Sequence, residues 1–264
     1  MRDHDQEHVR DMLQRLGFVV EQLTVSTDKR PDLLAQRDGE RLFVEVKSRR
    51  LDASLRKAMK SVRPGDQQTI ETTLEKHNTL SAEITGAVVQ LEALAGTDDY
   101  RLLWYRADLG PFVHGVFEQI TSTLLGTRCV RTASGTLRKC AYAGLGDFYR
   151  CASLDGVMIE VDEGINLLPN HFSPRYSRFA KSAMWASLPP RCVLDVLEAS
   201  TKGGWLIVEG PIDRREDAAL LAHLQHKYPA AEIVGFEVPV ATTHVTTIDA
   251  QATLDRRDRK GRTL

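Results

Sequence analysis

The dipeptide Asp38-Gly39, placed between two strand-like segments, constrains the fold of this chain more than any other feature of its sequence. Asp-Gly favours a two-residue hairpin turn, because both positions of that turn need positive φ angles. Residues 31–37 precede the turn, and residues 41–47 follow it with alternating side chains: Leu42, Val44 and Val46 against Phe43, Glu45 and Lys47. Such alternation is typical of a strand. Because a two-residue turn fixes the register, Asp32 is predicted to face Glu45.

The same register gives the hairpin two different faces. One face is continuously apolar, and its residues are Leu33, Ala35, Leu42 and Val44. The other carries Asp32 and Glu45, and the two-residue period of a strand places Lys47 beside Glu45. Carboxylates directly opposite each other lie about 5 Å apart and repel. A hard divalent cation, Mg²⁺ or its substitute Mn²⁺, would relieve that repulsion because it prefers oxygen ligands.

We therefore expect Asp32, Glu45 and Lys47 to converge on one metal ion. That set suits phosphodiester hydrolysis, in which a metal polarises the phosphoryl group and activates a water. The alternative is a solvated hairpin face on which Lys47 forms an ion pair with Glu45, worth at most about 1 kcal/mol.

The spacing of the site residues also resembles a known family. Pro31-Asp32 is followed after twelve residues by Glu45-Val46-Lys47, which is similar to the signature of the PD-(D/E)xK nuclease superfamily, including restriction endonucleases and Holliday-junction resolvases. The resemblance covers about residues 5–130. It implies a restriction-endonuclease-like core, with Asp32, Glu45 and the Val46 carbonyl as metal ligands and Lys47 as the catalytic lysine.

Two further residues enter through this resemblance. The segment from Glu7 to Phe18 is similar to the first helix of the family, which carries an active-site glutamate, so Glu7 becomes a candidate. An acid near a helix start is also favoured by the helix dipole alone. RecB-type members place a glutamine on a later helix, where this chain has Gln90. The tyrosine that usually follows four residues later is here Leu94, and an ordinary surface role for Gln90 stays open.

Local charge is concentrated next to the candidate site, although the whole chain has a formal charge of -1. Between residues 47 and 63, seven basic residues stand against Asp52 alone, and five of them are candidates for contact with nucleic acid: Arg49, Arg50, Arg56, Lys57 and Lys60. Phosphate binding and a solvated helix face explain this stretch equally well. A second stretch, residues 164–194, lacks acidic residues and interleaves arginines with aromatic residues, which suits either strand binding or core packing.

The remaining pattern predicts an α/β fold in two regions. A helix over 5–16 should end at Gly17, followed by a strand at 18–27, the hairpin, a helix and loop within 48–78, a helix over 81–95, a strand at 100–107, a helix over 113–125 and a strand at 128–132. We assign residues 1–132 to a nuclease-like domain with a mixed central sheet flanked by helices. Residues 133–264 form a smaller α+β region of unassigned role, with strands at 157–161, 205–209 and 232–240 and a helix over 214–228 that Asp213 and Glu216 would cap.

Composition narrows the setting of this protein. No apolar run approaches the roughly 18–20 residues of a membrane span, and the charged N-terminus is unlike a signal peptide, so we expect a cytoplasmic protein. Four cysteines are too few for a disulfide scaffold. The sequence thus favours an Mg²⁺-dependent endonuclease that acts on DNA rather than RNA. A homodimer is compatible with this interpretation. The alternatives are a catalytically inactive nuclease-fold module that binds nucleic acid or acts as a scaffold, and a defence effector controlled by a partner.

Overall fold

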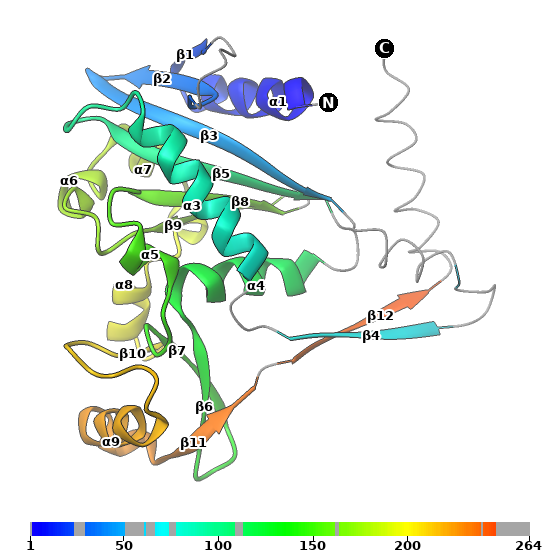
Figure 1. Ribbon diagram of the computed structural model, residues 1–264, viewed down its shortest axis with the longest axis vertical. Helices are drawn as coiled ribbons and strands as arrows, with labels where there is room; N and C mark the ends of the chain where they lie inside the picture. The colour runs from blue at the N-terminus through cyan, green and yellow to red at the C-terminus, as the bar shows by residue number, and fades with distance from the viewer. Residues whose placement is uncertain are drawn as a thin grey trace.

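A computed structural model describes residues 2–23, 30–50, 61, 67–73, 78–108, 113–161, 164–238 and 240–246. Its largest unit is a mixed six-stranded sheet flanked by helices, as predicted (Figure 1). The strands follow in the spatial order β1 (Val19–Gln22), β2 (Leu33–Arg37), β3 (Glu40–Arg50), β5 (Tyr100–Asp108), β8 (Gly156–Val161) and β9 (Gly164–Pro169). The predicted α/β class is therefore confirmed.

The hairpin at the centre of the sequence interpretation forms with its expected register. Asp38 and Gly39 both adopt positive φ angles, 52° and 79°, as a two-residue hairpin turn requires. Strands β2 and β3 pair antiparallel, and Leu33 opposes Val44 while Leu34 opposes Phe43. On its other edge β3 runs parallel to β5, which places Lys47 beside Tyr105. The outermost pairs, β1 with β2 and β8 with β9, are antiparallel.

Helices cover both faces of this sheet and complete two cores. Helix α1 (Arg2–Arg15) packs Val9 and Leu13 against the face that carries Leu33 and Val44. It ends at Arg15, and the predicted Gly17 follows two residues later with a φ of 88°, an angle that an L side chain rarely adopts. Helices α3 (Asn78–Glu92) and α4 (Val113–Leu125) cover the opposite face, the one that carries Phe43. The candidate carboxylate face is therefore a helix-covered face of the sheet.

A second, four-stranded sheet has the order β10 (Leu206–Ile207), β7 (Leu137–Ala141), β6 (Arg128–Thr132) and β11 (Ile233–Glu237). Helix α9 (Asp217–Lys227) packs Leu220 and Leu224 into its core. The predicted division at residue 132 does not separate the sheets, because β6 precedes it while β8 and β9, which follow it, join the first sheet. Local patterns reveal strands but carry no information on which sheet each strand enters.

The structure corrects two other local expectations. Residues 67–73, placed within a helix and loop, form strand β4 (Gln67–Thr73), which pairs with β12 (Val240–Thr246) far along the chain. At α9, Glu216 occupies the N-cap position without a side-chain cap, and Asp213 instead accepts a hydrogen bond from the Arg215 N–H at 2.9 Å. Both differences reflect contacts that a local pattern does not contain.

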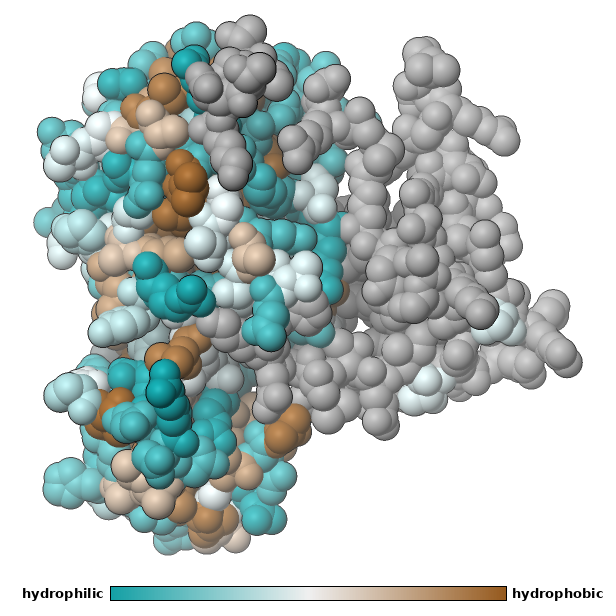
Figure 2. Space-filling view, in the orientation of Figure 1, coloured by the Kyte–Doolittle hydropathy of each residue, from teal (hydrophilic) through white to brown (hydrophobic). Residues whose placement is uncertain are grey.

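The described chain also contains four short α-helices, α5 (Asp147–Arg150), α6 (Tyr176–Phe179), α7 (Ala183–Ala186) and α8 (Val196–Thr201), and two 3-10 helices at Pro190–Cys192 and Pro229–Ala231. On the face drawn in Figure 2, hydrophilic residues dominate the coloured surface and apolar residues form separate small patches. Within the described residues, no helix has both the length and the apolar character needed to cross a membrane. The four cysteines are free thiols.

Candidate active site

Asp32 lies immediately before β2, where the hairpin opens toward the first helix. Its backbone N–H donates to the Val44 carbonyl at 3.1 Å, which continues the hairpin pairing to this residue. Its carboxylate accepts two hydrogen bonds, from the Val46 N–H at 2.7 Å and from the Gln6 side-chain amide at 2.5 Å. The sheet and α1 together therefore hold Asp32 against β3.

Glu45 lies on β3 and is almost fully buried, with 2% of its surface exposed. The pKa of Glu45 is raised to about 7, mainly by burial and then by the negative charge of nearby Asp32, while Lys47 acts to lower it. Glu45 Oε1 accepts from Lys47, but its buried Oε2 has no hydrogen-bond donor in the described part of the chain. A buried carboxylate oxygen without a donor is costly, so this atom is placed where a cation would stabilise it.

Lys47 connects the carboxylates to the helix that covers them. Its Nζ donates to Glu45 Oε1 at 2.5 Å and to the side-chain oxygen of Gln90, on α3, at 3.0 Å. The Gln90 amide in turn donates to the Arg30 backbone carbonyl at 3.2 Å. The Lys47 side chain keeps 22% of its surface exposed. An ammonium has three donors, so one remains for a bound group.

The first helix supplies a different residue from the one expected. Glu7 is exposed, and its neighbour Gln6, which is 6% exposed, is the α1 residue that contacts Asp32. The Gln6 side-chain oxygen also accepts from Gln22 on β1 at 3.2 Å. A role for Glu7 in the site therefore stays a prediction. The apolar residues of this segment predict the helical period, but the tilt of α1 on the sheet decides which polar residue points inward.

The basic residues are described only in part. Arg49 lies on β3 near the Tyr105 hydroxyl, and this positive charge lowers the pKa of Tyr105 against a larger upward effect of burial. Arg50 ends β3, and its side chain lies outside the described residues. Arg56, Lys57 and Lys60 lie outside them entirely. Only Arg49 is thus placed near the candidate site.

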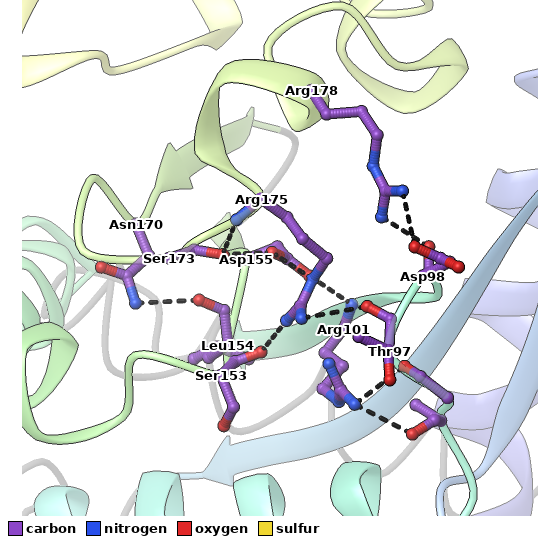
Figure 3. A network of polar contacts seen from close by, with 12 residues as sticks. Thr97, Asp98, Arg101, Ser153, Leu154, Asp155, Asn170, Ser173, Arg175 and Arg178 are labelled. Atoms are coloured by element: carbon purple, nitrogen blue, oxygen red, sulfur yellow. Dashed lines mark hydrogen bonds and ion pairs between the residues drawn. The ribbon is translucent and has the colours of Figure 1, made fainter.

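Residues of the acid-free stretch from 164 to 194 form contacts with other parts of the fold. Arg175 forms an ion pair with Asp155, its Nε lying 3.0 Å and 3.1 Å from the two carboxylate oxygens, and also donates to the Ser153 carbonyl (Figure 3). Arg178 contacts Asp98 at 3.2 Å. The Phe179 ring is fully buried. Of the two interpretations of this stretch, the arrangement favours core packing, since the acidic partners come from other parts of the chain.

The residues present fit a small divalent cation of the kind that prefers oxygen ligands. Asp32 and Glu45 supply two carboxylates, and a cation such as Mg²⁺ commonly uses one or two carboxylates together with water. Within the described residues no cluster of three or more His, Cys, Asp or Glu side chains is placed to hold a metal, so a richer protein cage is not formed there. Val46 reaches the site through its N–H group, which donates to Asp32.

Sequence reasoning thus located Asp32, Glu45, Lys47 and Gln90, which the structure brings together, and it missed Gln6. Comparison with known proteins adds no further assignment: no protein-family model, curated protein or solved structure matches the chain. What this site does must therefore be argued from its own geometry.

Proposed function

We propose that this protein is a metal-dependent nuclease that hydrolyses phosphodiester bonds, with DNA as the favoured substrate and a restriction-endonuclease-like core. The observation that carries the proposal is the convergence of Asp32, Glu45 and Lys47 at the open end of one hairpin. There the buried Glu45 Oε2 has no hydrogen-bond donor in the described chain. Two close carboxylates repel each other, and the single charge of Lys47 offsets only one of them, so a bound cation would stabilise the set.

Each side chain has a distinct part in this proposal. Asp32 and Glu45 would hold Mg²⁺, and when bound the ion polarises the phosphoryl group and offsets charge on the leaving oxygen. Lys47, fixed by Glu45 and Gln90, directs its remaining N–H group at the attacking water or at a phosphate oxygen. Gln6 acts on Asp32 rather than on substrate, because its amide holds one carboxylate oxygen in place. Arg49 extends the positive charge along β3, where it would attract the phosphate backbone.

The test is cleavage of single-stranded, duplex and branched DNA and of RNA, with Mg²⁺ or Mn²⁺, by the wild type and by Lys47→Ala. We expect metal-dependent cleavage by the wild type and a loss of at least about a hundredfold in the variant, since positioned charge and proton transfer each contribute on that scale. Arg191→Ala, which removes an exposed positive charge elsewhere, serves as the control. Equal cleavage by wild type and Lys47→Ala would refute the assigned site.

A second candidate is a non-catalytic module that binds nucleic acid or acts as a scaffold. The observation in its favour is that both oxygens of Asp32 and one of Glu45 already accept hydrogen bonds within the protein. Calorimetric titration with Mn²⁺ separates the two proposals. Absence of binding, or the same binding after Asp32→Ala, would favour the module, whereas binding lost in Asp32→Ala would favour the nuclease.

A further inference from the structure

A small hollow lies in the C-terminal part of the chain, between the turn that leads into α5 and the segment that precedes α9. Its volume is about 220 Å³, below the roughly 300–1,000 Å³ of sites that enclose a whole small molecule. The residues that matter here are Tyr142, Leu145, Tyr149, Phe172, Arg214 and Arg215. The hollow has room for one planar ring system, with the rest of a ligand outside.

The aromatic wall of this hollow is held in a fixed position. The Phe172 ring packs edge-on against Tyr142 at 4.9 Å and against Tyr149 at 5.3 Å, with interplanar angles of 71° and 89°. The Tyr142 hydroxyl lies 2.7 Å from His171 Nδ1, and His171 Nε2 lies 2.8 Å from Asp195 Oδ1. A ligand ring would therefore meet a surface that needs little ordering on binding.

Tyr142 also adopts an unusual backbone conformation. Its φ is 61°, in the left-handed region that costs a bulky residue energy and that is enriched at functional sites. The conformation is held by contacts on both sides of the residue: its N–H donates to the Leu125 carbonyl at 2.8 Å, and its carbonyl accepts from Arg214 Nε at 2.8 Å. The strained residue is thus one of those that line the hollow.

The rim is both apolar and positively charged. Tyr149 exposes 63% of its surface and Leu145 47%, so two large side chains that line the hollow are open to solvent. Arg214 donates to three backbone carbonyls, those of Tyr142, Ile212 and Gly210. In the described part of the chain no carboxylate forms an ion pair with Arg214 or Arg215. Asp213, which also lines the hollow, accepts a hydrogen bond from the Arg215 N–H at 2.9 Å.

From these observations we propose that the hollow binds one nucleotide, with its base against Tyr149 and Phe172 and its phosphate on Arg215. A base is a flat ring system that stacks on aromatic side chains. A phosphate would supply an anionic partner for Arg214 and Arg215, which form no ion pair in the described chain. Neither an apolar ligand nor a simple anion would use both parts of the site. The proposal does not depend on the metal site; if the protein acts on nucleic acid as proposed above, the ligand is an unpaired nucleotide within a strand.

The test measures binding without metal, in the presence of EDTA, so that its outcome is independent of cleavage. AMP and CMP are titrated by calorimetry, and a fluorescein-labelled single strand of twelve deoxyadenosines is titrated by anisotropy. We expect Tyr149→Ala to weaken binding by about 5- to 150-fold, the range for loss of one stacked base. Arg215→Ala should weaken it about tenfold and reduce its salt dependence. Both residues are exposed, so neither change should disturb folding, and Tyr149→Phe should bind like the wild type.

The control for charge is again Arg191→Ala, which removes an exposed arginine outside the hollow. Loss of mononucleotide binding in Tyr149→Ala with the oligonucleotide unaffected supports a site for free nucleotides, whereas loss of both supports a strand site. Failure of AMP, CMP and the oligonucleotide to bind at millimolar concentration would overturn the proposal. Binding of phosphotyrosine without any nucleotide would also overturn it, because the hollow would then recognise an acidic aromatic group of a protein.

Discussion

The buried carboxylate of Glu45 leads to a prediction that can be made quantitative, the effect of Glu45→Gln on stability. Because the pKa of Glu45 is raised from 4.5 to about 7, the folded state holds its proton to higher pH than the unfolded chain does. Wild-type stability therefore falls as pH rises from about 4.5 to 7. The glutamine of the variant cannot ionise, can still accept from Lys47, and places an amide where Glu45 Oε2 has no donor among the described residues.

The magnitude follows from the size of the pKa change. At about 1.4 kcal/mol per unit, the shift in Glu45 corresponds to about 3 kcal/mol of stability lost by the wild type above pH 7. We expect Glu45→Gln to match the wild type near pH 4.5 and to be more stable than it by up to about 3 kcal/mol at pH 8. Such a gain at a site residue is the stability cost that an active site commonly carries.

The assay is urea unfolding of metal-free protein in EDTA at a series of pH values from 4.5 to 8. Glu21→Gln, at an exposed position on β1, is the control and should show a small difference that does not change with pH. A Glu45→Gln variant that is equal to or less stable than the wild type at pH 8 would refute the reasoning. A stability gap that stays constant over the pH range would do the same.

Adding Mn²⁺ at pH 8 extends the same experiment to the proposed metal site. A ligand that binds only the folded state stabilises it in proportion to the logarithm of its concentration. We expect the wild type to gain stability with Mn²⁺ and Glu45→Gln to gain little, so that the difference between them shrinks. An equal gain in both proteins would contradict a role for Glu45 as ligand.

Three further predictions concern the polar contacts that position the site and the surrounding fold. Gln6→Ala removes the amide that donates to Asp32, and urea unfolding should show a loss of about 1–3 kcal/mol, the cost of removing a buried hydrogen bond to a charge. Arg175→Met leaves the carboxylate of Asp155, which is fully buried, without its ion pair, and the same assay should show a loss of about 3–5 kcal/mol. Burial acts to raise the pKa of Asp195, but hydrogen bonds from His171 and Tyr176 lower it to about 2; Asp195→Asn should therefore cost about 2 kcal/mol at pH 7, and the cost should diminish as pH falls from 4 toward 2.

Matched controls exist for each of these variants. Gln14→Ala changes an exposed glutamine of the same helix, Arg191→Met changes an exposed arginine, and Asp11→Asn changes an exposed aspartate. Each should alter stability by less than about 0.5 kcal/mol. The interpretation of Gln6 or Arg175 fails if its variant behaves like its control. A stability loss in Asp195→Asn that does not vary with pH would contradict the stated role of the carboxylate charge.

Within the hairpin, the sequence alone determined fold and site together. A two-residue turn fixes register, and register fixes which side chains share a face, so Asp32, Glu45 and Lys47 followed from local rules. The period of residues 5–16 likewise predicted α1 and its end at Gly17. These features depend on neighbours within a few residues, and for that reason they were accessible without tertiary structure.

Only the tertiary structure decided the rest. The choice of Gln6 over Glu7, the contact of Gln90 with Lys47 and the pairing of Arg175 with Asp155 each join segments far apart in the sequence. The same holds for the entry of β8 and β9 into the first sheet, and for the hollow at Tyr149, whose lining comes from three separate segments. Local periodicity states which side of a helix or strand is apolar, whereas the partner of each polar group depends on how those elements pack in space.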